Sequence, residues 1–201
     1  MPGPGRWLAA GQADLAVQRI LDAAGTVFVE RGIAATGMGH IATAASCSRA
    51  TLYRYFDSRE ALRLAYVERE ARRIANAVAG ETSSIADPAR RLAESILASV
   101  GLVRNDRVLA AWFNSADQGI TTELSAGSSV VERLAAGLTG DTGDLAAARW
   151  VVRIIVSLLT VPAADAAAER ELVEQFVVPP LLSRVPPQSG VSGGGRRRSP
   201  R

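Results

Sequence analysis

The sequence predicts an all-α protein, and three observations lead to this prediction. Hydrophobic residues make up 48% of the 201 residues, which is enough for a buried core. Alanine, leucine and arginine dominate the middle of the chain, whereas β-branched residues never form the alternating runs that mark strands. Glycine and proline concentrate near the two ends, so the middle is compatible with helices.

Helix signals divide the chain into four expected segments. Residues 1–13 are rich in Pro and Gly and are expected to be disordered, as is the Pro/Gly/Ser/Arg tail 183–201. Between them, capping residues and apolar stripes at helical spacing predict a small helical domain, 14–60, and a larger one, 61–182.

Several residues mark expected helix ends. Asp14 is the expected cap of the first helix, and Gly32 is the expected left-handed residue that ends it. Gly80 and Gly101 are expected to end two later helices. The run from Leu145 to Val161 is too apolar for a surface helix of a monomer, which predicts burial in a core or a dimer interface.

Charge is distributed unevenly along the chain. Residues 1–80 hold 10 Arg and 7 acidic residues, whereas residues 81–182 hold 8 Arg and 13 acidic residues. A basic N-terminal third beside an acidic body is typical of a nucleic-acid reader joined to a separate module.

The composition disfavours other classes of protein. One cysteine, Cys47, excludes an intramolecular disulfide, and one histidine, His40, excludes His-rich metal sites. We therefore expect no catalytic residues, no metal and no cofactor. No apolar run reaches the roughly 18 residues that cross a bilayer, so we expect a cytoplasmic protein without membrane contact. Cys47 is interpreted as an ordinary turn residue, with a redox switch as the alternative.

Two short helices joined by a tight turn, Met38 to Ala45 and Arg49 to Tyr55, indicate a helix-turn-helix that reads DNA. Ser48 is the expected N-cap of the second helix, whose N-terminus suits a phosphate. Arg side chains can pair with guanine, small methyl groups can meet thymine, and tyrosine hydroxyls commonly contact phosphates. The inward-facing positions of this unit are expected to be Ile41, Ala44, Leu52 and Phe56.

The surrounding residues carry a more specific pattern. The first-helix run I-L-D-A-A-G-T-V-F-V-E-R-G, the I-A of the second helix, and T-L-Y-R-Y-F-D-S-R-E-A-L fall within residues 19–62. This stretch resembles the N-terminal domain of the tetracycline-repressor-like (TetR) family. The resemblance implies an all-helical homodimer whose C-terminal part binds a small-molecule effector and dimerises through the last two helices.

Position by position, the resemblance implies a set of contacts with a roughly palindromic double-stranded DNA operator. The positions that match the family's base and phosphate contacts are Thr36, Ser48, Arg49, Ala50, Thr51, Tyr53, Tyr55 and Arg59. Ser46 departs from the family pattern by replacing a turn glycine, which costs stability if the turn requires a positive φ. Gly37 and Gly39 also depart from it, at the start of the second helix.

The expected function is that of a ligand-responsive repressor that a small molecule releases from its operator. Candidate effector-binding residues are Trp112, Phe113 and Asp117, although aromatic residues at helical spacing also suit a plain core. Two alternatives stay open, namely an activator of the same family and a helical enzyme or carrier of small molecules.

Overall fold

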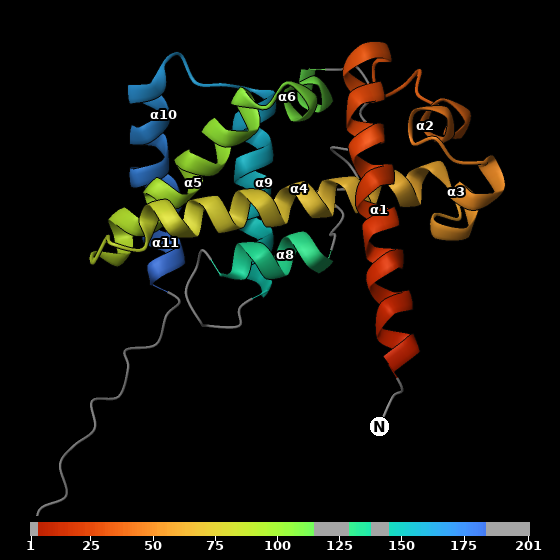
Figure 1. The fold of residues 1–201 in the computed structure, drawn as a ribbon. Coiled ribbons are helices and arrows are strands. Elements are labelled where there is room, and N and C mark those ends of the chain that lie inside the picture. The colour runs from red at the N-terminus through yellow and green to blue at the C-terminus, as the bar shows by residue number, and fades with distance from the viewer. Residues whose placement is uncertain (1–3, 115–128, 138–144, 184–201) are drawn as a thin grey trace, which may run out of the picture.

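The chain forms a bundle of helices in which a small N-terminal unit is attached to a larger body by one long helix (Figure 1). This computed structural model describes residues 4–114, 129–137 and 145–183. No strand occurs among these residues, which confirms the all-α prediction. None of the helices in the described ranges combines the length and the apolar character that crossing a membrane requires.

The N-terminal unit consists of α1 (Pro4–Arg31), α2 (Met38–Ala44) and α3 (Arg49–Tyr55). Two expectations about α1 are wrong, because the helix begins at Pro4 and includes both Asp14 and most of segment 1–13. Proline suits the first position of a helix, and the residues that follow include good helix formers, so the helix starts earlier than its acidic residue. Gly32 has φ of 79° after the end of α1, as expected.

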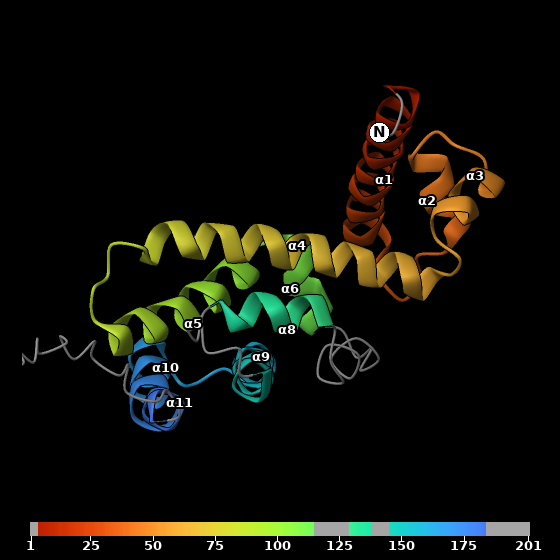
Figure 2. The same cartoon turned by 90° about the horizontal axis from the view of Figure 1, so that it is seen from below.

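Helix α4 (Arg59–Thr82) joins the two parts and runs from α3 along one side of the body (Figure 2). Ser58 caps it, because its Oγ accepts a hydrogen bond of 3.0 Å from the Ala61 N–H. The helix continues past Gly80, where we expected it to end. Thr82 is buried and donates its hydroxyl to the Val78 carbonyl, so the last turn is packed and hydrogen-bonded.

Six further helices complete the body within the described ranges. They are α5 (Pro88–Asn105), α6 (Arg107–Asn114), α8 (Ser129–Ala136), α9 (Leu145–Thr160), α10 (Ala166–Leu172) and α11 (Val178–Leu182). Of these, α5 and α8 pack along α4, while α9 and α11 pack on α5. The expectation that Gly101 ends a helix is wrong: α5 continues to Asn105, because the apolar stripe extends to the buried Val103.

A π-helical segment, Val173–Val177, joins α10 to α11. The Val178 N–H donates to the Val173 carbonyl, which widens the turn. Pro179 and Pro180 follow immediately and have no N–H to continue the α-helical ladder, which explains why the helix widens here. The wide turn therefore lies just before these prolines.

Candidate DNA-binding surface and effector cavity

The turn between α2 and α3 has the hydrogen bonds of a Schellman motif. The Ser46 N–H donates to the Thr43 carbonyl at 3.1 Å, and the Cys47 N–H donates to the Ala42 carbonyl at 2.9 Å. Ser46 has φ of 55°, the only positive φ of a non-glycine residue in the described ranges. A serine therefore occupies the left-handed position that glycine usually fills.

The first turn of α3 is open to solvent and well capped. The Ser48 Oγ accepts a hydrogen bond of 3.0 Å from the Thr51 N–H and lies 2.9 Å from the Thr51 Oγ1. Arg49 and Ala50 are exposed beside this cap. An exposed helix start with free N–H groups, a hydroxyl and a guanidinium can meet both a phosphate and a base edge.

The two tyrosines of α3 differ in their surroundings. Tyr53 is 47% exposed, whereas Tyr55 is half-buried and packs against the core. The Arg54 guanidinium lies 5.2 Å from the centre of the Tyr55 ring, a cation–π distance. Arg59, at the start of α4, has a buried Nε without a hydrogen-bond partner in the part of the chain that the structure describes. Tyr53 is thus the more accessible of the two rings.

Two sequence-based expectations about this unit are wrong. Thr36 is completely buried, and its hydroxyl donates to the Gly32 carbonyl at 2.7 Å, so it cannot reach DNA in this structure. The end of α1 leaves that carbonyl without a helical partner, and Thr36 supplies one. Ala44 is exposed instead of facing inward, and Ala42 takes the inward position between the helices.

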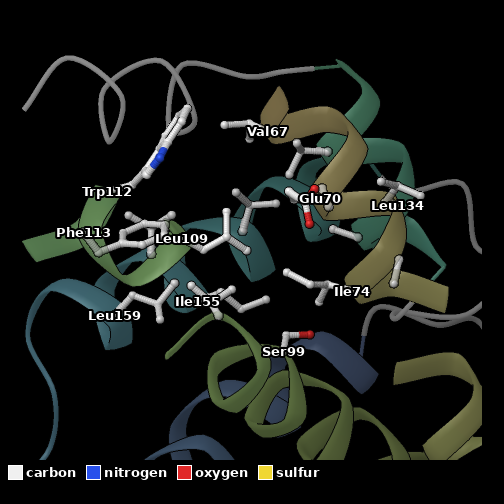
Figure 3. Close-up of a pocket in the computed structure, with 17 residues that line it drawn as sticks. Val67, Glu70, Ile74, Ser99, Leu109, Trp112, Phe113, Leu134, Ile155 and Leu159 are labelled. Carbon is white, nitrogen blue, oxygen red and sulfur yellow. The ribbon is translucent and has the colours of Figure 1, made fainter. Parts of the chain in front are cut away.

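A cavity of about 130 Å³ lies in the body between α4, α5, α6, α8 and α9 (Figure 3). Trp112 and Phe113 line it, as expected, whereas Asp117 lies outside the described residues. Sequence reasoning missed two polar residues of its wall, Glu70 and Ser99. The other lining residues are apolar: Val67, Ala71, Ile74, Ala75, Val103, Leu109, Val131, Leu134, Ala135, Val152, Ile155, Val156 and Leu159.

Both polar groups of the wall already have partners within the protein. The Ser99 hydroxyl donates to the Ser95 carbonyl at 2.7 Å. The Glu70 carboxylate accepts from the Arg69 Nε at 3.0 Å and from the Arg73 Nε at 2.7 Å. Each arginine also pairs with a second carboxylate, Arg69 with Asp22 and Arg73 with Asp106. The hydrogen bond to Glu70 is the main cause that raises the pKa of Arg73. The cavity therefore presents an almost entirely apolar surface to a ligand.

Two sets of contacts connect the cavity wall to α1. Arg69 also donates to the Asp22 carboxylate of α1 at 2.7 Å. The Trp112 ring stacks on Tyr66 at 5.8 Å and meets Phe28 of α1 edge-on at 5.5 Å. Burial raises the pKa of Tyr66 to about 12, with the negative charge of Glu70 as the next cause.

Large apolar side chains are exposed on α9 and on the segment from α10 to α11. Trp150 is 45% exposed, Leu172 40% and Phe176 70%. Figure 2 shows that both elements lie on the side of the body away from α4. Large apolar side chains exposed on one side of a protein can mark a protein–protein contact.

An all-helical body behind an exposed, capped recognition helix defines a helix-turn-helix DNA-binding protein. The profile of the bacterial regulatory proteins of the tetR family matches residues 20–66. The chain is 46% identical over 179 residues to an uncharacterised HTH-type transcriptional regulator, Rv1255c of Mycobacterium tuberculosis (strain H37Rv), covering 86% of this chain and 89% of that protein. The chain belongs to the TetR family and is an HTH-type transcriptional regulator.

The comparisons also include more distant relatives. The HTH-type transcriptional activator FasR of Mycolicibacterium smegmatis is 33% identical over 88 residues, covering 44% of this chain and 40% of that protein. Among solved structures, the TetR family repressor AlkX from Dietzia has a TM-score of 0.65 at 22% identity, covering 83% of this chain and 95% of that one. RolR in complex with resorcinol has a TM-score of 0.59 at 21% identity, covering 88% and 90%. These structures support the fold.

Proposed function

We propose that this regulator is a homodimeric repressor that a small, uncharged, apolar effector releases from a roughly palindromic operator. The observation that carries the proposal is a built apolar cavity joined to α1 of the DNA-binding unit by the contacts of Arg69 and Trp112. In this proposal residues up to about 60 read DNA, residues 61–182 bind the effector and dimerise, and the protein acts in the cytoplasm without catalysing a reaction.

The exposed face of α3 supplies the DNA contacts in this proposal. Arg49 is the candidate for a bidentate pair with guanine, and Thr51 and Ala50 are candidates for contacts with thymine methyl groups. Ser48, Tyr53 and Arg59 are proposed to contact phosphates, with a smaller contribution from the half-buried Tyr55. Thr36 is not among the proposed DNA contacts, because its side chain is buried.

The properties of the cavity support a particular class of effector. A dry cavity of roughly 150 Å³ accepts a benzene-sized molecule in other proteins, so about 130 Å³ suits one ring or a short alkyl chain. A charged ligand would lose its hydration without finding a free counter-charge, because the described lining residues include no cation and Glu70 is already paired. Small, neutral and largely apolar molecules are therefore the proposed effectors. RolR shows that a protein with this fold holds resorcinol.

The exposed apolar residues support dimerisation through α9 and the segment from α10 to α11. Burying Trp150, Leu172 and Phe176 against the same surface of a second copy would remove them from water. A dimer also supplies two copies of α3, which can enter successive major grooves about 34–36 Å apart.

The decisive experiment measures binding to DNA fragments selected from the native genome, with and without a panel of small apolar compounds. We expect salt-dependent binding and release by at least one neutral compound. Arg49→Ala is expected to weaken specific binding by about five-fold or more, since a bidentate base contact is worth about 1–3 kcal/mol. The matched control is Arg72→Ala, an exposed arginine of α4, which is expected to bind like wild type. Normal sequence preference in Arg49→Ala would refute the assignment of α3.

A second candidate function is activation, which the partial similarity to the activator FasR favours. A reporter gene placed behind the selected operator separates the two functions. A repressor lowers expression and the effector restores it, whereas an activator raises expression.

A further inference from the structure

Gly39 lies in the first turn of α2, beneath the side chain of Arg49. A Cβ atom on Gly39 would lie 3.0 Å from both the Cζ and the Nε of Arg49 and would overlap with one of its terminal nitrogens, Nη2. All three of the nearest atoms belong to the Arg49 guanidinium. A methyl group at this position would therefore displace the end of that side chain and leave the backbone of both helices in place.

The direction of the Arg49 side chain explains this contact. Arg49 is the first residue of α3, and helical side chains lean toward the N-terminus of their helix, which here faces α2. No hydrogen bond or ion pair holds Arg49 within the described part of the chain. The structure instead places the guanidinium over the bare backbone at Gly39, and a planar guanidinium can lie flat on such a surface.

We propose that Gly39 is a positioning residue that sets the orientation of Arg49 and thereby the base preference of α3. The inference rests on the proposed role of Arg49 as a contact to guanine in the major groove. An arginine whose side chain is already placed loses less conformational freedom on binding, which favours the complex. Glycine at 39 thus has a role in DNA reading besides its effect on helix stability.

The test compares Gly39→Ala with wild type in the full-length protein, by operator affinity and by the base preferences obtained from a randomised DNA pool. We expect an affinity about 3- to 10-fold lower and altered preference at the same base pairs that Arg49→Ala affects. Thermal stability is not expected to fall, because alanine is the better helix former. Gly80→Ala is the matched control: a Cβ there has nothing within 4 Å, and its base preference is expected to stay normal.

A double-mutant comparison separates positioning from a general effect on the fold. In the Arg49→Ala background, Gly39→Ala is expected to change affinity less than about twofold, because the side chain that it displaces is gone. An unchanged base preference in Gly39→Ala, or an effect that persists fully in the Arg49→Ala background, would overturn the inference. If Arg49→Ala itself has no effect on affinity or preference, the proposed function of Arg49 is refuted as well, so the two failures are distinguishable.

Discussion

Replacing Ser46 by glycine is expected to stabilise the protein. Ser46 adopts φ of 55° in the turn before α3, and this left-handed conformation costs an ordinary L-residue roughly 1–2 kcal/mol. Glycine relieves that strain, but its greater freedom in the unfolded chain opposes folding by roughly 0.5–1 kcal/mol. With the middle value of each range, the net gain in the free energy of unfolding is about 0.75 kcal/mol. For a chain of this size, it corresponds to a rise in Tm of about 1–4 °C.

The measurement is urea or thermal unfolding followed by circular dichroism at fixed protein concentration, since the stability of a dimer depends on concentration. Ser46→Ala is the matched control, because it keeps the strain and removes only the hydroxyl. That hydroxyl makes no hydrogen bond within the described ranges, so Ser46→Ala is expected to stay within about 0.5 kcal/mol of wild type. If Ser46→Gly is no more stable than wild type while Ser46→Ala is neutral, the strain argument is wrong.

Three further predictions test the body. Ala71→Leu fills the cavity and is expected to weaken effector-induced release at least tenfold without lowering operator affinity, whereas Ala79→Leu, on the exposed side of α4, leaves release normal. Phe176→Glu is expected to shift the dimer to monomer in sedimentation velocity, because it places a charge in the apolar contact; Leu15→Glu, also at an exposed apolar residue, should remain dimeric. Burial raises the pKa of Tyr66 to about 12 from its ordinary value of 10. The stabilisation that the neutral Tyr66 side chain gives the folded state is therefore complete below pH 10 and is lost as pH rises toward 12. Wild type should therefore lose more stability than Tyr66→Phe between pH 9 and about 11, and equal losses in unfolding titrations would contradict this assignment.

Local signals in the sequence predicted the parts of the fold that depend on neighbours along the chain. Ser48 caps α3, Gly32 ends α1 in the left-handed region, and the limits of α3 are as expected. Such features are decided within a few residues, where capping and backbone preference act. The prediction that Gly101 ends a helix was wrong because the apolar stripe of α5 continues past this glycine to Val103.

The wall of the cavity could not be predicted in the same way. Glu70 lies on the buried face of α4 between apolar residues, and the sequence gives no sign of which arginines will pair with it. One of them, Arg69, also binds Asp22, 47 residues earlier in the chain. Contacts across such separations depend on how the helices pack, and a helical periodicity specifies only which face is buried.

The connection between cavity and DNA-binding unit has a thermodynamic consequence. Trp112 contacts the cavity on one side and Phe28 of α1 on the other, and Arg69 joins Glu70 of the wall to Asp22 of the same helix. An effector can shift the equilibrium between the DNA-bound and the released arrangement only by as much as its affinity differs between the two. Because such coupling is reciprocal, saturating the protein with operator DNA must weaken effector binding by the same factor by which the effector weakens operator binding. If the contacts of Arg69 and Trp112 with α1 are both removed, each of the two factors should fall to one. The effector and the operator DNA should still bind, each in the absence of the other.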